Sequence, residues 1–279
     1  MSFSVSVDGH LLTLKSPHDF DFLHRFGRVF RVFDHLISGN LCFGIENKKG
    51  RYFVKYAGAL SENYLGSAEQ AIERLKNGAD LYRAISHPAL PKLLYEEKTE
   101  SGYLCIFPWL DAYPIGPLPD SFVRMRSLPF IQRCAMLDSF FSLLVEAAHM
   151  DYLAAGLSDS HILIDFERAR LYLCSMDDFI RMPAINTRGR LPGSPYYLAP
   201  EAYRIGAELG EPLTVYAMGA AAMALLGDRY TMAPECWEAS QSLLRLTLSA
   251  LSEDEKKRPV SAESFLSAWR NGILDLPFQ

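Results

Sequence analysis

The chain has 279 residues, 49% hydrophobic and 22% charged, so it can bury the core of one two-lobed unit or of two small domains. Its formal net charge of -5 and isoelectric point near 5.8 argue against general nucleic-acid or anionic-membrane binders, because those classes need clustered lysine and arginine. The five cysteines have neither metal-site nor disulfide-framework spacing, and we expect buried thiols in a reducing, cytoplasmic compartment. No signal peptide or membrane span is expected, since no apolar run approaches the roughly 18 residues that a span needs.

The first part of the chain alternates apolar and polar residues, which is typical of β-strands. Residues 3–14 predict a hairpin that turns at Asp8-Gly9, a pair that tolerates positive φ. Three further strands are predicted at residues 29–33, 41–46 and 51–56. The loop DHLISG lies between the first and second of these strands, and the turn NKKG lies between the second and third.

Residues 67–85 predict a helix, since Ser67 and Gln70 can form a capping box and apolar residues recur on one face. Apolar runs on either side of a polar stretch then predict two more strands, at 90–94 and 103–109.

The second part is predicted to be mainly helical. Residues 110–119, LDAYPIGPLP, should be irregular and are the best candidate for a hinge. A strongly apolar helix is predicted at 129–150. A hairpin follows, with strands at 162–164 and 171–174 joined by a polar corner at 165–168.

Three motifs resemble the protein kinase superfamily. GSPYYLAPE at 193–201 is similar to the Gly-Thr-x-x-Tyr-x-Ala-Pro-Glu segment that ends the kinase activation loop. TVYAMG at 214–219 resembles the start of the family's buried central helix, with Thr214 in place of the Asp that anchors the catalytic loop. EDEKKRPVSAESFLSAW resembles the closing Arg-Pro-Ser-Ala-x-x-Leu pattern, which implies a buried structural ion pair between Arg258 and Glu201.

The resemblance covers about 29–269 and implies an α+β, two-lobed protein-kinase-like fold of the divergent bacterial serine/threonine type. The expected division is a small antiparallel β-rich lobe with one helix at 1–112 and a larger, mainly helical lobe at 113–279. Together these lobes would form a single kinase-like domain.

The catalytic positions depart from the family pattern. Counting from the predicted hairpin, Gly156 stands where kinases have the catalytic Asp, and His161 stands where they have a metal-binding Asn. Ser175 stands at the other metal ligand. The acids Asp177 and Asp178 follow it closely, so the register of the metal-binding Asp stays open among these three residues.

The nucleotide-binding positions are also altered. Lys55 matches the strand lysine that pairs with phosphates, although it could equally be a solvated strand residue. Gly78 stands where the helix Glu that pairs with this lysine is expected. The loop 34–39 keeps only Gly39 of a glycine-rich phosphate loop, and is either a modified nucleotide flap or an ordinary strand connection.

Three functions are consistent with this pattern. The first is a pseudokinase, a protein-binding or regulatory module with weak or no nucleotide binding. The second is an atypical active serine/threonine kinase that uses Lys55 on ATP, Asp159 as the base and Asp177 on magnesium. The third is another nucleotide-dependent enzyme on the same fold.

The implied cofactors are ATP and magnesium, and the implied partner or substrate is a protein rather than a nucleic acid. Asp159 is also open to interpretation as a turn residue, and Asp177 as a cap.

Overall fold

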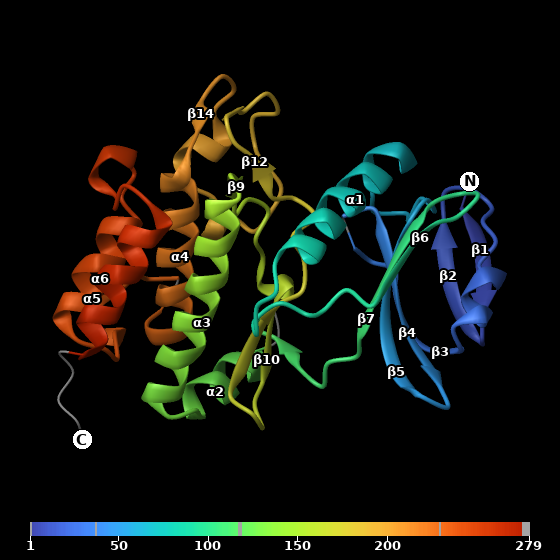
Figure 1. Cartoon of the computed structure of the whole chain (residues 1–279), viewed down its shortest axis with the longest axis horizontal. Helices are drawn as coiled ribbons and strands as arrows, with labels where there is room; N and C mark the ends of the chain where they lie inside the picture. Colours follow the sequence, from blue (N-terminus) through green and yellow to red (C-terminus); the bar gives the residue numbers. More distant parts are fainter. Residues whose placement is uncertain (1, 37, 117–118, 229, 275–279) are drawn as a thin grey trace. The chain divides into compact units, whose positions relative to one another are not determined.

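The computed structural model describes residues 2–36, 38–116, 119–228 and 230–274 (Figure 1). The chain is an α+β protein that divides into two compact units: unit 1, Met1–Ser86 with Pro91–Asp111, and unit 2, His87–Leu90 with Ala112–Gln279. Unit 1 is built on an antiparallel five-stranded sheet with one α-helix, and unit 2 is more helical. None of the described helices is long and apolar enough to cross a membrane.

The sheet of unit 1 has the order β3-β4-β5-β7-β6, with every neighbouring pair antiparallel. Its strands are β3 (Arg28–Phe33), β4 (Asn40–Asn47), β5 (Gly50–Ala57), β6 (Tyr95–Lys98) and β7 (Tyr103–Pro108). The predicted succession of strand, loop, strand, turn and strand at 29–56 is confirmed. Asn47 pairs with Gly50, so only Lys48 and Lys49 form the turn between β4 and β5.

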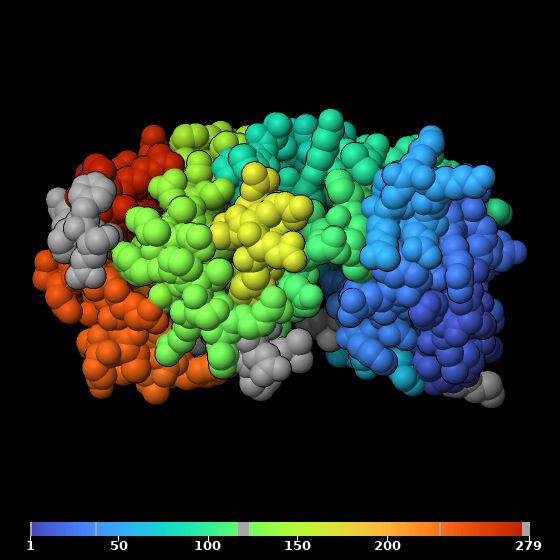
Figure 2. All heavy atoms as spheres, turned by 90° about the horizontal axis from the view of Figure 1, so that it is seen from below, coloured from blue at the N-terminus to red at the C-terminus, as the bar shows by residue number. Residues whose placement is uncertain are grey.

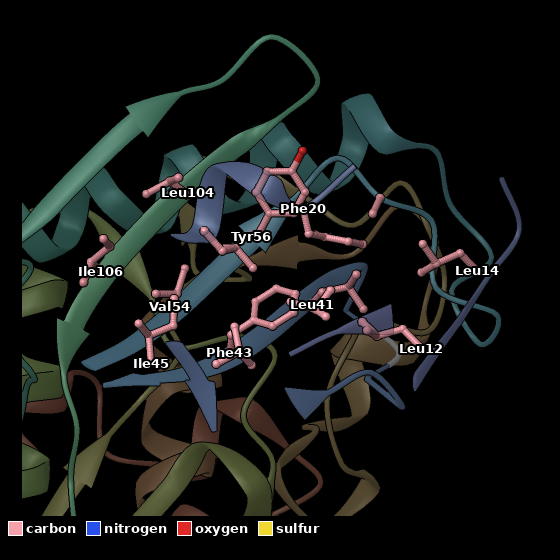
Figure 3. Close-up of a cluster of buried hydrophobic side chains, with 14 residues drawn as sticks. Leu12, Leu14, Phe20, Leu41, Phe43, Ile45, Val54, Tyr56, Leu104 and Ile106 are labelled. Carbon is pink, nitrogen blue, oxygen red and sulfur yellow. The ribbon is translucent and has the colours of Figure 1, made fainter. Parts of the chain in front are cut away.

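One face of this sheet carries the core of unit 1, drawn in Figure 3. Successive strand residues point to opposite faces, which brings Phe43, Ile45 and Val54 to the same side. Leu12 and Leu14 of the N-terminal hairpin pack in the same cluster. The alternating residues of these strands therefore supply one apolar set of side chains to this core.

The N-terminal hairpin is formed by β1 (Phe3–Val7) and β2 (His10–Leu14), as predicted. Asp8 and Gly9 connect the strands and both have positive φ, 48° and 86°. Two positive φ values in a two-residue connection match the right-handed twist of the strands, and aspartate and glycine adopt them readily.

The α-helix of unit 1, α1 (Ala68–Ala84), begins with the predicted capping box. The Ser67 hydroxyl accepts a hydrogen bond from the Gln70 N–H at 3.3 Å, and the Gln70 side chain accepts one from the Ser67 N–H at 3.1 Å. Both groups satisfy backbone donors that the first helical turn leaves unpaired.

The strand predicted at 90–94 is wrong, because the strand lies at β6 instead. Glu96 accepts a hydrogen bond from the Tyr103 hydroxyl at 2.6 Å, and Glu97 forms an ion pair with Arg25 at 2.9 Å. β6 is an edge strand with one neighbour, so polar side chains are tolerated on it and its apolar alternation is lost.

Unit 2 is organised around α4, which is apolar on every side and lies among α3, α5 and α6 (Figure 1). A Cβ atom at Gly219 would lie 2.8 Å from the Cβ of Ala250, so the glycine lets α5 approach α4 closely. The helix predicted at 129–150 and the one expected to start near 214 are confirmed. The α-helices of unit 2 are α2 (Pro119–Ser127), α3 (Phe130–His149), α4 (Glu211–Leu226), α5 (Gln241–Ala250) and α6 (Ala262–Leu274).

Short strands and 3-10 turns connect these helices. The predicted hairpin is confirmed as β10 (Ile162–Asp165) and β11 (Arg170–Leu173), which β8 (Tyr113–Pro114) joins. The other strand pairs are β9 (Tyr152–Leu153) with β12 (Ile180–Arg181), and β13 (Ala184–Ile185) with β14 (Glu208–Leu209). The 3-10 turns are η1 (Asp21–Arg25) in unit 1, and η2 (Asp159–His161), η3 (Pro195–Tyr197), η4 (Pro200–Tyr203), η5 (Pro234–Cys236) and η6 (Glu255–Lys257) in unit 2.

The segment predicted to be an irregular hinge at 110–119 is partly regular. Tyr113–Pro114 forms β8, and α2 starts at Pro119. Pro117 and Leu118 lie outside the described residues.

Candidate functional site

The loop after β9 contains the position at which the kinase resemblance expects a catalytic base. Gly156 is buried there, with a φ of +74°. A Cβ atom at this position would lie 2.2 Å from the Cβ of Asp178. A side chain would therefore require Asp178 to move and would hold the backbone in a strained conformation. The loop has no carboxylate at this position and no space for one.

Thr214, near the start of α4, anchors the same loop. Its Oγ1 accepts a hydrogen bond from the Ala154 N–H at 2.9 Å, and both residues are buried. The kinase resemblance implies a changed contact, because threonine stands where kinases have an aspartate. In the structure the hydroxyl oxygen acts as the acceptor, and the loop stays fixed to the central helix.

Replacing Thr214 by valine is expected to lower the free energy of unfolding by about 1 to 3 kcal/mol, because the buried Ala154 N–H loses its acceptor. Thr214→Ser keeps the hydroxyl and should lose less. Urea unfolding followed by circular dichroism measures both variants. A larger loss in Thr214→Ser than in Thr214→Val would show that packing of the methyl group, rather than the hydrogen bond, holds the loop.

Asp159, the candidate for a shifted base, lies in the turn η2. Its Oδ1 accepts a hydrogen bond from the hydroxyl of Tyr197, a buried residue of the 193–201 motif. The same two segments meet again where the Leu157 carbonyl accepts the N–H of Ser194 at 2.9 Å. The Asp159 carboxylate thus joins two loops, as a structural turn residue would.

Asp165 closes the corner of the β10–β11 hairpin. Its Oδ1 accepts the N–H groups of Glu167 and Arg168, both at 3.0 Å, and its Oδ2 accepts from the Arg168 guanidinium at 2.9 Å. Burial by itself would raise the pKa of Asp165, but the hydrogen bonds from Arg168 and Glu167 bring this pKa below its ordinary value. Phe166 at the corner packs under the guanidinium of Arg124 in α2, 4.3 Å from the ring centroid. Figure 2 shows the hairpin, in yellow, beside the green residues of unit 2.

The metal-ligand candidates follow β11. Asp177 is buried, whereas Ser175 and Asp178 are partly exposed. His161, at the position of the kinase Asn, accepts the Cys174 N–H through its backbone carbonyl at 2.8 Å. Across the described ranges of the chain, no three His, Cys, Asp or Glu side chains gather in a group that could hold a metal ion. The register of a metal-binding Asp stays open.

Glu201 and Arg258 form the buried ion pair expected from the motifs. The two guanidinium nitrogens lie 2.6 and 3.0 Å from the carboxylate oxygens. Arg258 also donates to the carbonyls of Ser252 and Pro212, at 2.8 and 3.1 Å, and its guanidinium lies over the ring of Tyr216. This arginine therefore ties the end of the 193–201 motif to α4 and to the chain before α6.

Lys55 lies in the middle of the unit 1 sheet, where it pairs with Cys42 of β4 and Cys105 of β7. Its residue is only 5% exposed, so the interpretation of Lys55 as a solvated strand residue is wrong. Gly78, at the position of the kinase helix Glu, is buried in α1 and carries no carboxylate.

The loop between β3 and β4 is packed against α1. Gly39 has a φ of +80°, and a Cβ atom there would lie 2.7 Å from the ring of Tyr64 and 2.9 Å from the Cβ of Ala71. Arg74 of α1 donates to the carbonyl of the residue before Gly39 at 3.0 Å. Ile37 of this loop lies outside the described residues. Gly39 thus allows a close contact within unit 1.

Neither a scan against protein-family models nor a search of curated proteins matches this chain. The site is accordingly defined by the contacts of its residues and by the motifs of the sequence.

Asn186, a buried residue directly after β13, was missed by the sequence analysis. Its side-chain N–H groups donate to the carbonyls of Gly189 and Glu201 at 2.6 and 3.2 Å, and its Oδ1 accepts the Arg188 N–H at 3.0 Å. One asparagine in an aperiodic segment carries no pattern. The only local signal is a turn-forming residue close to glycine.

Proposed function

We propose that the chain has a two-lobed protein-kinase-like fold and acts as a pseudokinase, a protein-binding or regulatory module that does not transfer phosphate. The observation that carries this proposal is at Gly156. Kinase chemistry needs a positioned carboxylate that receives the proton of the substrate hydroxyl. At the matching position a positive φ and the Cβ of Asp178 leave no room for one. The nearby Asp159 accepts a hydrogen bond from Tyr197.

Two contacts support the kinase-like part of the proposal. Thr214 anchors the loop at Ala154, and Arg258 pairs with Glu201. Each contact joins residues that are distant in sequence, and three of the four lie within the motifs on which the resemblance rests. The framework contacts of the motifs are thus present while the reactive groups are replaced.

Nucleotide binding is proposed to be weak or absent. A phosphate loop needs bare backbone amides that can approach the phosphates. In the β3–β4 loop, Gly39 is used for packing against Tyr64 and Ala71. Asp34 in the same loop adds a carboxylate that would repel phosphate.

An atypical active serine/threonine kinase is the second candidate, and the burial of Lys55 and Asp177 favours it. Burial of charged groups is costly, so such residues often serve binding or catalysis. In this function Lys55 would bind ATP, Asp177 would hold magnesium and Asp159 would act as the base.

Addition of ATP, with or without magnesium, is expected to leave the melting temperature of the protein unchanged. A ligand that binds only the native state would stabilise it by about 2.7 kcal/mol at 100 times its Kd, which is easily detected. Differential scanning fluorimetry makes the measurement, with Lys55→Ala and Asp177→Asn as matched variants.

A magnesium-dependent rise in melting temperature that both variants abolish would favour the active kinase. Phosphoryl transfer itself is tested by incubation with labelled ATP and magnesium or manganese, followed by intact-mass analysis. Robust autophosphorylation that disappears in Asp159→Ala would overturn the pseudokinase proposal.

A further inference from the structure

The loops between β12 and α4 lie at one end of unit 2 (Figure 1). They carry exposed basic and apolar residues. Ile185, Tyr203 and Ile205 are 60%, 42% and 76% exposed. Grouped exposure of large apolar side chains is typical of interaction sites. We call this region the loop surface, and it consists of Arg181, Ile185, Arg188, Tyr203, Arg204 and Ile205.

The loop surface is held by backbone hydrogen bonds. The Asn186 N–H donates to the Ala207 carbonyl at 2.8 Å, and the Gly206 N–H donates to the Asn186 carbonyl at 2.7 Å. These bonds extend the β13–β14 pairing and put Ile185 and Ile205 on adjacent chain segments. The exposed apolar groups therefore belong to one ordered surface.

The backbone next to Arg188 approaches Ile205, one of the two isoleucines. A Cβ atom at Gly189 would lie 3.5 Å from the Cγ1 of Ile205, which brings the chain around Arg188 against the Ile205 side chain. The N–H of Arg188 is fixed by the Asn186 side chain. Arg188 and the exposed Ile205 thus lie on neighbouring chain segments.

The charge of the loop surface is opposite to that of the chain. Residues 181–208 contain four arginines and two glutamates, whereas the whole chain has a net charge of -5. One of the two glutamates, Glu201, is already paired with Arg258. Within the part of the chain that the structure describes, the three arginines of the loop surface form no ion pair. A positive surface on an acidic protein selects partners of negative charge.

We propose that the loop surface binds an acidic segment of a partner protein that also carries branched aliphatic side chains. The aliphatic groups of the partner pack on Ile185, Tyr203 and Ile205. Its carboxylates pair with Arg188 and Arg204. This inference gives a surface and a partner chemistry to the protein-binding role proposed above, and it rests on that role.

Fluorescence anisotropy with a short fluorescein-labelled peptide that repeats Glu-Glu-Leu tests the inference, with a Lys-Lys-Leu repeat as the control peptide. Saturable binding of the acidic peptide is expected, and added salt should weaken it. The double variant Arg188→Glu/Arg204→Glu should weaken binding by about tenfold or more. Ile205→Ser should weaken it by about fivefold.

Arg245→Glu on α5 and Ile131→Ser on α3 are the matched controls, because both residues are exposed and lie outside the loop surface. These variants should bind the acidic peptide as the unmodified protein does. Equal binding of the two peptides, no binding, or unchanged binding by the loop-surface variants would each overturn the inference. Those outcomes leave the proposal that the protein is a pseudokinase in place. ATP-dependent phosphoryl transfer to a substrate would overturn the pseudokinase proposal without altering the peptide result.

Discussion

Gly156→Ala should lower the free energy of unfolding by about 3 kcal/mol. A non-glycine residue at a φ of +74° costs about 1 to 2 kcal/mol, and relieving the overlap with Asp178 costs a similar amount. Chemical denaturation gives the loss directly. Gly206→Ala is the matched control, because Gly206 has a φ of +80° but nothing lies within 4 Å of its Cβ position. That variant should lose only the backbone part, about 1 kcal/mol.

A second change separates overlap from backbone strain. Asp178→Gly removes the Cβ atom that a side chain at 156 would meet. In the Asp178→Gly background, Gly156→Ala should therefore cost no more than Gly206→Ala does. Losses of equal size at positions 156 and 206 in the unmodified protein would contradict the packing described for this loop.

Gly156→Asp should not produce phosphoryl transfer even where the variant folds. In the proposed alignment His161 and Ser175 still stand where kinases have the groups that hold metal ions, and catalytic groups that act together are strongly non-additive.

The other large effect is expected at the buried ion pair. Glu201→Ala or Arg258→Ala should each lower the free energy of unfolding by about 3 to 5 kcal/mol, because each leaves an uncompensated buried charge. Thermal and urea unfolding measure the loss. In the double variant neither charge remains, so the combined loss should be smaller than the sum.

The exposed pair between Arg270 and Asp138 provides the control. Its N–O distance is 2.8 Å, so its geometry is comparable, but both side chains are partly exposed to water. Asp138→Ala should cost no more than about 1 kcal/mol. A similar loss at both pairs would mean that burial does not decide the strength of the Glu201–Arg258 interaction.

Most elements of the fold could be predicted where a periodic pattern coincides with a boundary signal. Phe43 and Ile45 alternate along β4 because both point into the core of unit 1, and Ser67 with Gln70 marks the start of α1. The strand β6 could not be predicted, since an edge strand needs no apolar alternation. The helix α2 was hidden by the proline-rich segment, although a proline at its first position is itself a start signal.

The site could be predicted only in part. Sequence spacing locates Gly156 and pairs Glu201 with Arg258, because both follow from motifs. The approach of Asp178 to Gly156 depends on two loops meeting, which no local pattern encodes. The burial of Lys55 is equally hidden, since a lysine on a central strand and one on an exposed face have the same local sequence.

The contacts of the 154–157 loop also have a kinetic consequence. The Ala154 amide is bonded to the central helix, and the Leu157 carbonyl is bonded to the Ser194 amide. Neither amide can exchange its hydrogen with solvent unless its bond opens, and opening one disturbs a segment to which the other is joined. The loop, α4 and the 193–201 motif should therefore exchange as one cooperative element, with protection close to that of global unfolding. The 154–157 loop is then as stable as the core of unit 2 that surrounds it.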